Sequence, residues 1–142
     1  MAIIRLNQIG VNQYTRTKAI NKKIARTRRQ RGYNWEDTLV KRFNSLKYWK
    51  AFRLGSPSIA LPDVLAVNNP ESTIFTVEAK SGTGTTLQVP FDQIERCLNW
   101  VNNFQVYQNR EVILAFKFLS KKRICLLYTS DAADEGLGVD LG

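Results

Sequence analysis

Two apolar segments joined by a short polar turn constrain the fold more than any other feature of this sequence. Residues 63–67 and 73–80 are rich in Val, Ile, Phe and Thr, a composition typical of β-strands. Between them, residues 68–71 read Asn-Asn-Pro-Glu, and these residue types favour turns. We therefore predict a β-hairpin over residues 63–80.

Helical spacing predicts one helix on each side of this hairpin along the chain. Before it, apolar residues recur at helical spacing over residues 35–46, and Asn34 is a suitable N-cap. Gly32 is expected to separate this helix from any helix over residues 20–31. After the hairpin, Pro90 suits the first turn of a second helix. The core face of that helix comprises Ile94, Cys97, Leu98, Val101 and Phe104.

Two further strands complete the predicted fold. Residues 48–53 precede the hairpin, and a nearly continuous apolar run at residues 111–118 follows the second helix. The order helix, strand, strand, strand, helix, strand predicts an α/β fold with a mixed central sheet flanked by helices. With 142 residues the chain has room for one domain, and no apolar run approaches the roughly 20 residues of a membrane span.

The composition excludes several kinds of active site. The chain contains no histidine, which excludes histidine-based zinc sites, Ser-His triads and histidine general bases. Its 2 cysteines, Cys97 and Cys125, lack metal-ligand spacing and cannot form a disulfide framework, so a reducing, cytoplasmic location is expected. Carboxylates are therefore the charged oxygen ligands that the chain can offer to a metal ion.

Positive charge is concentrated near the N-terminus. The formal net charge is +9, and residues 1–32 contain nine Lys or Arg side chains and no Asp or Glu. Such a block repels itself unless a polyanion is near, so we interpret residues 1–31 as a basic arm that binds nucleic acid. The alternative is a solvated tail with no dedicated partner.

Acidic side chains in the hairpin indicate a metal site. Glu78 and Lys80 are two residues apart on a predicted strand, so both emerge on the same face, and the neighbouring strand can place Asp63 beside Glu78. Such charges among apolar strands are costly to bury unless a cation or substrate compensates them, and Mg²⁺ or Mn²⁺ prefers oxygen ligands. The alternative is an ordinary ion pair at a strand end.

A third carboxylate, Glu36, lies on the buried stripe of the first predicted helix, three residues before Leu39. It could lean over the sheet as a third metal ligand or as an anchor for a water molecule. Alternatively, it lies there because a carboxylate is favourable near the positive N-terminus of a helix.

These residues resemble a known nuclease signature. Pro62-Asp63 followed by Glu78-Ala79-Lys80 matches the PD-(D/E)xK motif. The chain is also similar to the archaeal Holliday-junction resolvases in Arg31–Glu36, Arg53–Ser56, Gln93–Leu98 and Ala115–Phe118. This resemblance implies a restriction-endonuclease-like core and an endonuclease that hydrolyses phosphodiesters at four-way DNA junctions during recombination and repair.

The resemblance also implies a role for each motif residue. Asp63, Glu78 and the carbonyl of Ala79 would hold Mg²⁺, for which Mn²⁺ can substitute, and Glu36 would complete the metal site. Lys80 would orient or activate the attacking water.

Further implications concern the substrate and the assembly. Ser56, or equally Ser58, corresponds to a serine near the scissile phosphate. The family acts as a homodimer that cuts two opposed strands of branched DNA, so an association with the nucleoid is expected. Trp100 and Phe104 could form the dimer interface, although Phe104 could instead pack in the core. Selection by DNA shape is expected through backbone contacts. The residues expected to make them are Arg28, Arg29, Arg31, Arg53 and Gln93.

We interpret the C-terminal residues 125–142 as a segment that does not belong to the natural protein. Residues 125–135, CLLYTSDAADE, resemble the translation of a transposase sequencing adapter, and residues 125–142 contain four acids and no Lys or Arg. We therefore predict a nuclease domain over residues 32–124 and a foreign tail over residues 125–142. A genuine acidic tail is the alternative.

Two other functions are compatible with the sequence. The chain could be another PD-(D/E)xK nuclease, such as a repair or restriction enzyme that cuts duplex or flap DNA. It could also be a non-catalytic nucleic-acid-binding module in which Asp63, Glu78 and Lys80 only form ion pairs.

Overall fold

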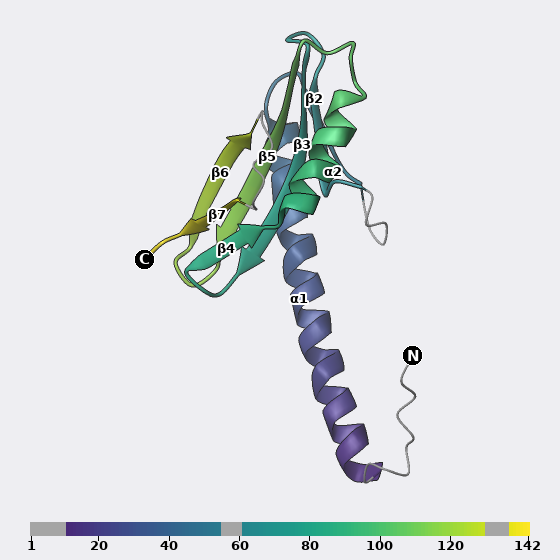
Figure 1. Ribbon diagram of the computed structural model, residues 1–142, viewed down its shortest axis with the longest axis vertical. Coiled ribbons are helices and arrows are strands. Elements are labelled where there is room, and N and C mark those ends of the chain that lie inside the picture. Colours follow the sequence, from purple (N-terminus) through teal and green to yellow (C-terminus); the bar gives the residue numbers. More distant parts are fainter. Residues whose placement is uncertain (1–10, 55–60, 130–136) are drawn as a thin grey trace. The chain divides into compact units, whose positions relative to one another are not determined.

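The structure, a computed structural model, describes residues 11–54, 61–129 and 137–142. The chain divides into two units, residues 1–31 and residues 32–142. In its described residues, the second unit contains a five-stranded sheet, a two-stranded sheet and the helix α2 (Figure 1).

Helix α1 spans Val11–Ser45 and continues through Gly32. The predicted interruption at Gly32 and the predicted N-cap at Asn34 are therefore wrong. A glycine inside a helix costs only about 1 kcal/mol relative to alanine, and the arginines and glutamine before it are good helix formers. The apolar stripe nevertheless begins where the spacing predicts, because Trp35 and Leu39 are buried.

The five-stranded sheet has the order β1-β2-β3-β5-β6. Strands β1 (Trp49–Arg53), β2 (Val64–Asn68) and β3 (Thr73–Gly82) are antiparallel neighbours. Strand β5 (Asn109–Phe118) runs parallel to β3, and β6 (Arg123–Thr129) runs antiparallel to β5. The predicted hairpin and the mixed sheet of the predicted α/β fold are both confirmed.

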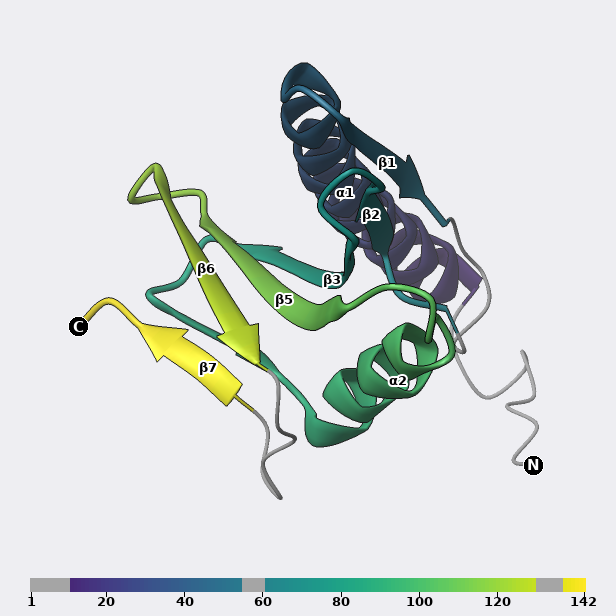
Figure 2. The same ribbon diagram turned by 90° about the horizontal axis from the view of Figure 1, so that it is seen from above.

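Helix α2 and the C-terminal part of α1 lie on opposite faces of this sheet (Figure 2), with an apolar cluster under each. On one face, the α1 residues Trp35 and Leu39 pack against the sheet. Their buried partners are Ala51, Val64, Ala66, Val77, Ile113 and Ala115. On the other face, α2 (Phe91–Asn102) packs through three buried side chains. These three, Ile94, Cys97 and Val101, meet sheet residues that include Ile74, Val112, Leu114 and Phe116.

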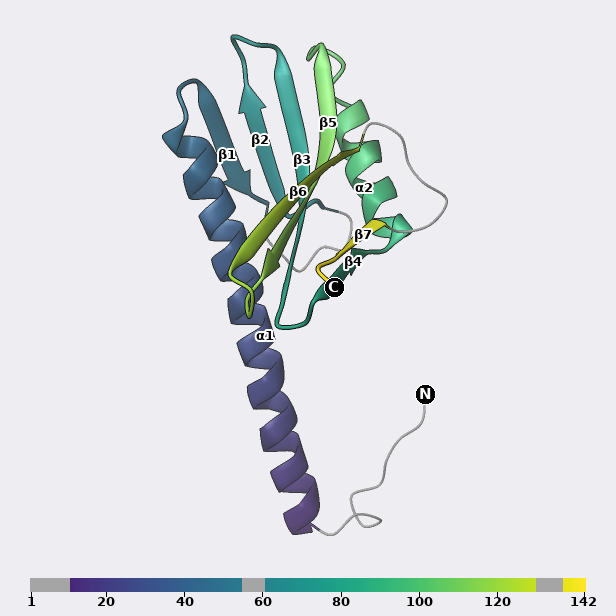
Figure 3. The same ribbon diagram turned by 90° about the vertical axis from the view of Figure 1, so that its left-hand side faces the viewer.

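Four strands were not predicted or extend beyond a predicted boundary. Strands β4 (Thr86–Val89) and β7 (Leu137–Asp140) form a small antiparallel sheet (Figure 3). Strand β3 continues to Gly82, beyond the predicted end of the hairpin at residue 80. Strand β6 crosses the predicted boundary at residue 124. Its pairing does not test the origin of residues 125–129, because an apolar, β-prone segment can pair with β5 whatever its source.

Within the described residues, no helix is both long enough and apolar enough to span a membrane.

Candidate active site

Asp63 lies immediately before β2, and contacts with both neighbouring strands hold it in place. Its carbonyl accepts a hydrogen bond from the N–H of Leu54 (3.0 Å), and its own N–H donates to the carbonyl of Val77 in β3 (3.1 Å). The carboxylate oxygen Oδ2 accepts a hydrogen bond from the N–H of Ala79 (2.8 Å). The side chain of Asp63 is therefore directed at the part of β3 that carries Glu78 and Lys80.

Glu78 is a buried acid in the middle of β3, on the face that α2 covers. It is 3% exposed, and its two carboxylate oxygens have different partners. Oε1 lies 3.6 Å from Nζ of Lys80, whereas Oε2 accepts a hydrogen bond of 2.8 Å from Nη2 of Arg96. The thiol of Cys97 also lies 3.7 Å from Oε2. As the spacing predicts, Glu78 and Lys80 share one face of the strand.

Burial and neighbouring charge alter the protonation of this cluster. Burial raises the pKa of Glu78, the negative charge of Asp63 raises it further, and the hydrogen bond from Arg96 opposes both effects. Burial also raises the pKa of the Cys97 thiol, and the charge of Glu78 adds to this effect. Cys97 is therefore a neutral thiol rather than a reactive thiolate.

Glu36 follows Trp35 on α1, and its side chain is 16% exposed, 4.0 Å from Nε of Arg53. Burial raises the pKa of Glu36 to about 7, and the charge of Asp63 adds to this effect while Arg53 opposes it. The charge of Glu78 raises the pKa further. The helix N-terminus cannot explain this position, because α1 begins at Val11.

The three predicted acids are therefore close enough for their charges to raise the pKa values of Glu36 and Glu78, although these two lie on opposite sides of the sheet. Glu36 belongs to α1 and Glu78 faces α2, and the charge of Asp63 raises the pKa of both. In the part of the chain that the structure describes, no three acidic or cysteine side chains are gathered closely enough to hold a metal ion. In this arrangement Glu78 forms ion pairs with Lys80 and Arg96.

The residues predicted to bind DNA lie in different surroundings. Arg28, Arg29 and Arg31 are exposed on α1. Arg53 forms an ion pair with Asp37 (3.2 Å), and its guanidinium also lies over an aromatic ring, that of Tyr33, 4.9 Å from the centroid.

Two further predictions concern α2 and the segment before β2. Gln93 is half-buried on α2, and among the described residues no group hydrogen-bonds to its buried Oε1. Ser56 and Ser58 both lie outside the described residues.

Sequence reasoning missed Arg96. It is the only Lys or Arg in Phe91–Asn102, and it directly precedes Cys97 on the predicted core face. A single basic residue beside a buried stripe is a signal that could have found it, because such a charge needs a partner.

An aspartate before one strand of a hairpin, with a buried glutamate and a lysine two residues apart on the other, is the arrangement that the PD-(D/E)xK motif implies. Together with the mixed sheet between two helices, it places the protein in the restriction-endonuclease-like class. The sequence model of the archaeal Holliday junction resolvases (Hjc) matches residues 27–135, and the chain belongs to this family. It is a nuclease that resolves Holliday junctions, as predicted, and branched DNA is its substrate.

A solved structure supports the same fold. Hjc from the archaeal hyperthermophile Archaeoglobus fulgidus, a Holliday junction resolvase, superposes with a TM-score of 0.59 at 18% sequence identity. The similarity covers 76% of this chain and 85% of that chain. No curated protein matches the sequence. The predicted restriction-endonuclease-like fold is therefore confirmed.

Proposed function

We propose that this resolvase is a magnesium-dependent endonuclease whose active site comprises Asp63, Glu78, Lys80 and Glu36. The observation that carries the proposal is the position of Glu78, a 3% exposed carboxylate beside Lys80 and within the influence of Asp63. Burying like charges together is costly, and binding a divalent cation would offset that cost.

The donor set suits magnesium. Carboxylates and a backbone carbonyl are the oxygen ligands that Mg²⁺ prefers, and Mn²⁺ accepts the same ligands. The N–H and C=O of one strand residue point the same way, so the carbonyl of Ala79 is expected on the side where its N–H meets Asp63. Glu36, Asp63 and Glu78 would hold the ion, which requires the side chains to move closer together.

The protein residues then position the reacting groups. When bound, the metal neutralises charge on the phosphate and lowers the pKa of a water molecule. Lys80, 29% exposed and held 3.6 Å from Oε1 of Glu78, can donate a hydrogen bond to the attacking water or to a phosphate oxygen that gains charge. Ser56 is proposed to lie near the scissile phosphate, with Ser58 as the alternative.

Backbone contacts with DNA are assigned to Arg28, Arg29, Arg31, Arg53 and Gln93. The exposure of the three helical arginines supports this assignment, because a basic surface binds phosphates without reading bases. Arg53 links the assignment to the active site, since it is partly exposed and lies beside Glu36.

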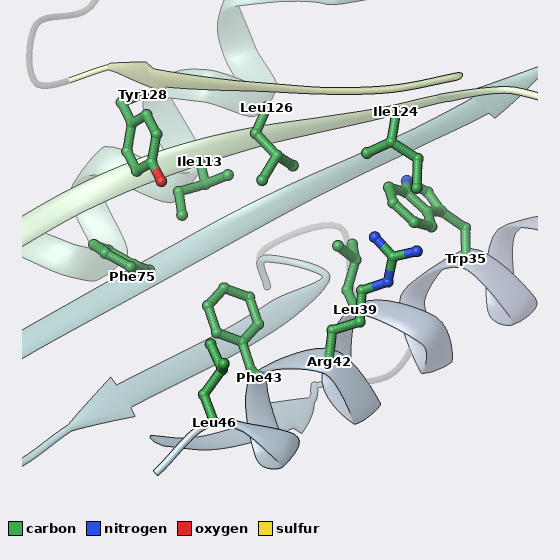
Figure 4. Close-up of a pocket in the computed structure, with 10 residues that line it drawn as sticks. All are labelled: Trp35, Leu39, Arg42, Phe43, Leu46, Phe75, Ile113, Ile124, Leu126 and Tyr128. Atoms are coloured by element: carbon green, nitrogen blue, oxygen red, sulfur yellow. The ribbon is translucent and has the colours of Figure 1, made fainter. Parts of the chain in front are cut away.

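We also propose that the protein acts as a homodimer, because resolving a four-way junction requires cuts in two opposed strands, one for each active site. Phe104 packs against the core cluster under α2, which leaves Trp100 of the two predicted interface residues. A groove of about 230 Å³ between α1 and the sheet offers a second apolar surface (Figure 4). Leu46 and Tyr128 at this groove are 54% and 62% exposed. Light scattering should give twice the chain mass.

A foreign origin for residues 125–142 stays a proposal. Strand β6 and the family match both extend beyond residue 124, but the resemblance to a translated adapter is independent of strand pairing. A genomic amplicon read across codon 125 tests it, because a sequence that diverges from CLLYTSDAADE is expected. A location at the nucleoid is proposed because the substrate is DNA.

Cleavage assays with the full chain test the proposed function. The substrates are a mobile four-way junction, a linear duplex and a flap, each in Mg²⁺, in Mn²⁺ and in EDTA. We expect junction cleavage in either metal and none in EDTA. Asp63→Ala and Glu78→Ala should bind the junction as the parent does but cleave it at least about 100-fold more slowly. Asp92→Ala removes an exposed acid of α2 and should change neither property.

Other outcomes identify the alternatives. Preferential cutting of the duplex or the flap would indicate a different nuclease activity on the same fold. Junction binding by a parent protein that never nicks the junction in Mg²⁺ or Mn²⁺ would indicate a non-catalytic binding module and would contradict the proposal.

A further inference from the structure

Arg96 is the nearest cation to the buried acid of the proposed active site. Its Nη2 donates a hydrogen bond of 2.8 Å to Oε2 of Glu78, and its side chain is only 19% exposed. The residue comes from α2, whereas the motif residues belong to β3 or directly precede β2. The folded domain therefore adds a basic side chain to a site that the hairpin alone does not complete.

The two oxygens of Glu78 are held by different means. Oε2 faces Arg96 and the thiol of Cys97. Oε1 faces Lys80 at 3.6 Å, beyond hydrogen-bond distance. One oxygen is thus anchored inside the domain, and the other is turned toward the lysine proposed to act in the reaction.

We propose that Arg96 is a positioning residue for the nuclease reaction, which anchors Oε2 of Glu78 so that Oε1 is presented to the metal and to Lys80. This inference rests on the proposed function. A glutamate side chain has several rotamers, and fixing one costs conformational entropy. A partly buried arginine supplies a planar, directional partner that fixes the carboxylate plane, so Glu78 is already oriented before a cation binds.

The contact could instead serve only to neutralise a buried charge. The two roles predict opposite effects of removing the cation. Loss of a neutralising charge leaves more negative charge in the site, so a metal ion should bind more tightly. Loss of a positioning contact lets the carboxylate of Glu78 change its orientation. Loss of a residue that orients a metal ligand typically weakens metal binding 10–100-fold.

Arg96→Gln and Arg96→Lys test the inference in the full chain. Arg110→Gln is the matched control, since Arg110 lies on the same face of the sheet as Glu78 but at the start of β5. The measurements are Mn²⁺ binding by calorimetry without DNA, single-turnover junction cleavage at saturating Mg²⁺, and the thermal midpoint of unfolding.

We expect Arg96→Gln to weaken Mn²⁺ binding about 10-fold and to slow cleavage at saturating Mg²⁺ at least about 10-fold. Arg96→Lys, which keeps a cation and a donor, should recover part of both losses, and Arg110→Gln should change neither. If Arg96→Gln does not fold, Arg96→Lys decides, because a positioning role predicts a slower rate at saturating metal even with the charge retained.

Tighter Mn²⁺ binding, or an unchanged rate at saturating Mg²⁺ with only a lower thermal midpoint, would overturn the inference and leave the proposed function intact. A parent protein that neither binds Mn²⁺ nor cleaves the junction would overturn both.

Discussion

Helix α1 has very different surfaces before and after residue 32. All residues from 20 to 31 are exposed, and this stretch contains basic side chains and no acids. From Trp35 onward the helix has an apolar stripe, with Trp35 1% and Leu39 5% exposed. The first part therefore exposes positive charge to solvent, and the second part packs on the sheet.

The packing of this second part explains why Glu36 is partly buried and lies within the influence of Asp63 and Glu78. The side chain next to it, Trp35, is fixed on the sheet by burial and by a hydrogen bond from Nε1 to the carbonyl of Ala115 (3.1 Å). An acid beside such an anchor is held partly buried even though water would solvate it better. Residues 20–31, by contrast, contain no buried side chain.

The largest expected effect on stability comes from breaking the packed part. Trp35→Ala should lower the free energy of unfolding by about 3–5 kcal/mol, because it leaves a large cavity and removes the hydrogen bond to the carbonyl of Ala115. Ile24→Ala removes a side chain that is 47% exposed and should change it by less than about 0.5 kcal/mol. Urea unfolding measures both values, and equal losses would contradict the difference between the two parts.

A smaller effect is expected from the charge of Glu36. Between pH 4.5 and about 7, the folded chain keeps a proton on Glu36 that the unfolded chain has released. Stability relative to Glu36→Gln should therefore be highest below pH 4.5 and fall as the pH rises through about 7, by up to about 3 kcal/mol.

Urea unfolding in EDTA between pH 4 and pH 8 gives this difference directly. A stability difference that does not change with pH would show that the folded structure leaves the pKa of Glu36 at its ordinary value. Added Mg²⁺ should reduce the loss at high pH, because the cation favours the ionised carboxylate.

The smallest effect on stability is expected in the basic part, where the effect on binding is large. Lys22, Arg26 and Arg29 lie on one side of the helix by their spacing. Replacing all three with Gln should leave the free energy of unfolding within about 0.5 kcal/mol. If each contacts one phosphate, the slope of log K against log salt for junction binding should become about 2.7 less steep.

The matched control replaces Lys41, Lys47 and Lys50, which are equally exposed, with Gln. Fluorescence anisotropy between about 50 and 200 mM salt measures the slope. An equal change of the slope in the control would mean that junction binding depends only on net charge. The basic arm would then not be a specific DNA-binding surface.

Local patterns predicted the elements whose neighbours in sequence are also their neighbours in space. The hairpin, α2 and β5 could be predicted because alternation, turn residues and helical spacing are properties of short segments. Gly32 misled for the opposite reason, since one unfavourable residue does not break a helix whose other residues favour it. Strands β4 and β7 were missed because each is a short edge segment that depends on a partner about 50 residues away.

The same division applies to the active site. The sequence alone indicated Asp63, Glu78 and Lys80 as candidate site residues. Residues two apart on a strand point to the same face of the sheet, and the motif places all three residues in the hairpin. Only the tertiary structure decided which groups surround Glu78 and which oxygen each one meets. Arg96 arrives from a separate helix, and Glu36 acts from the opposite layer. The physical reason is that burial and charge act through space, so the protonation and orientation of a side chain depend on neighbours that the order of residues does not specify.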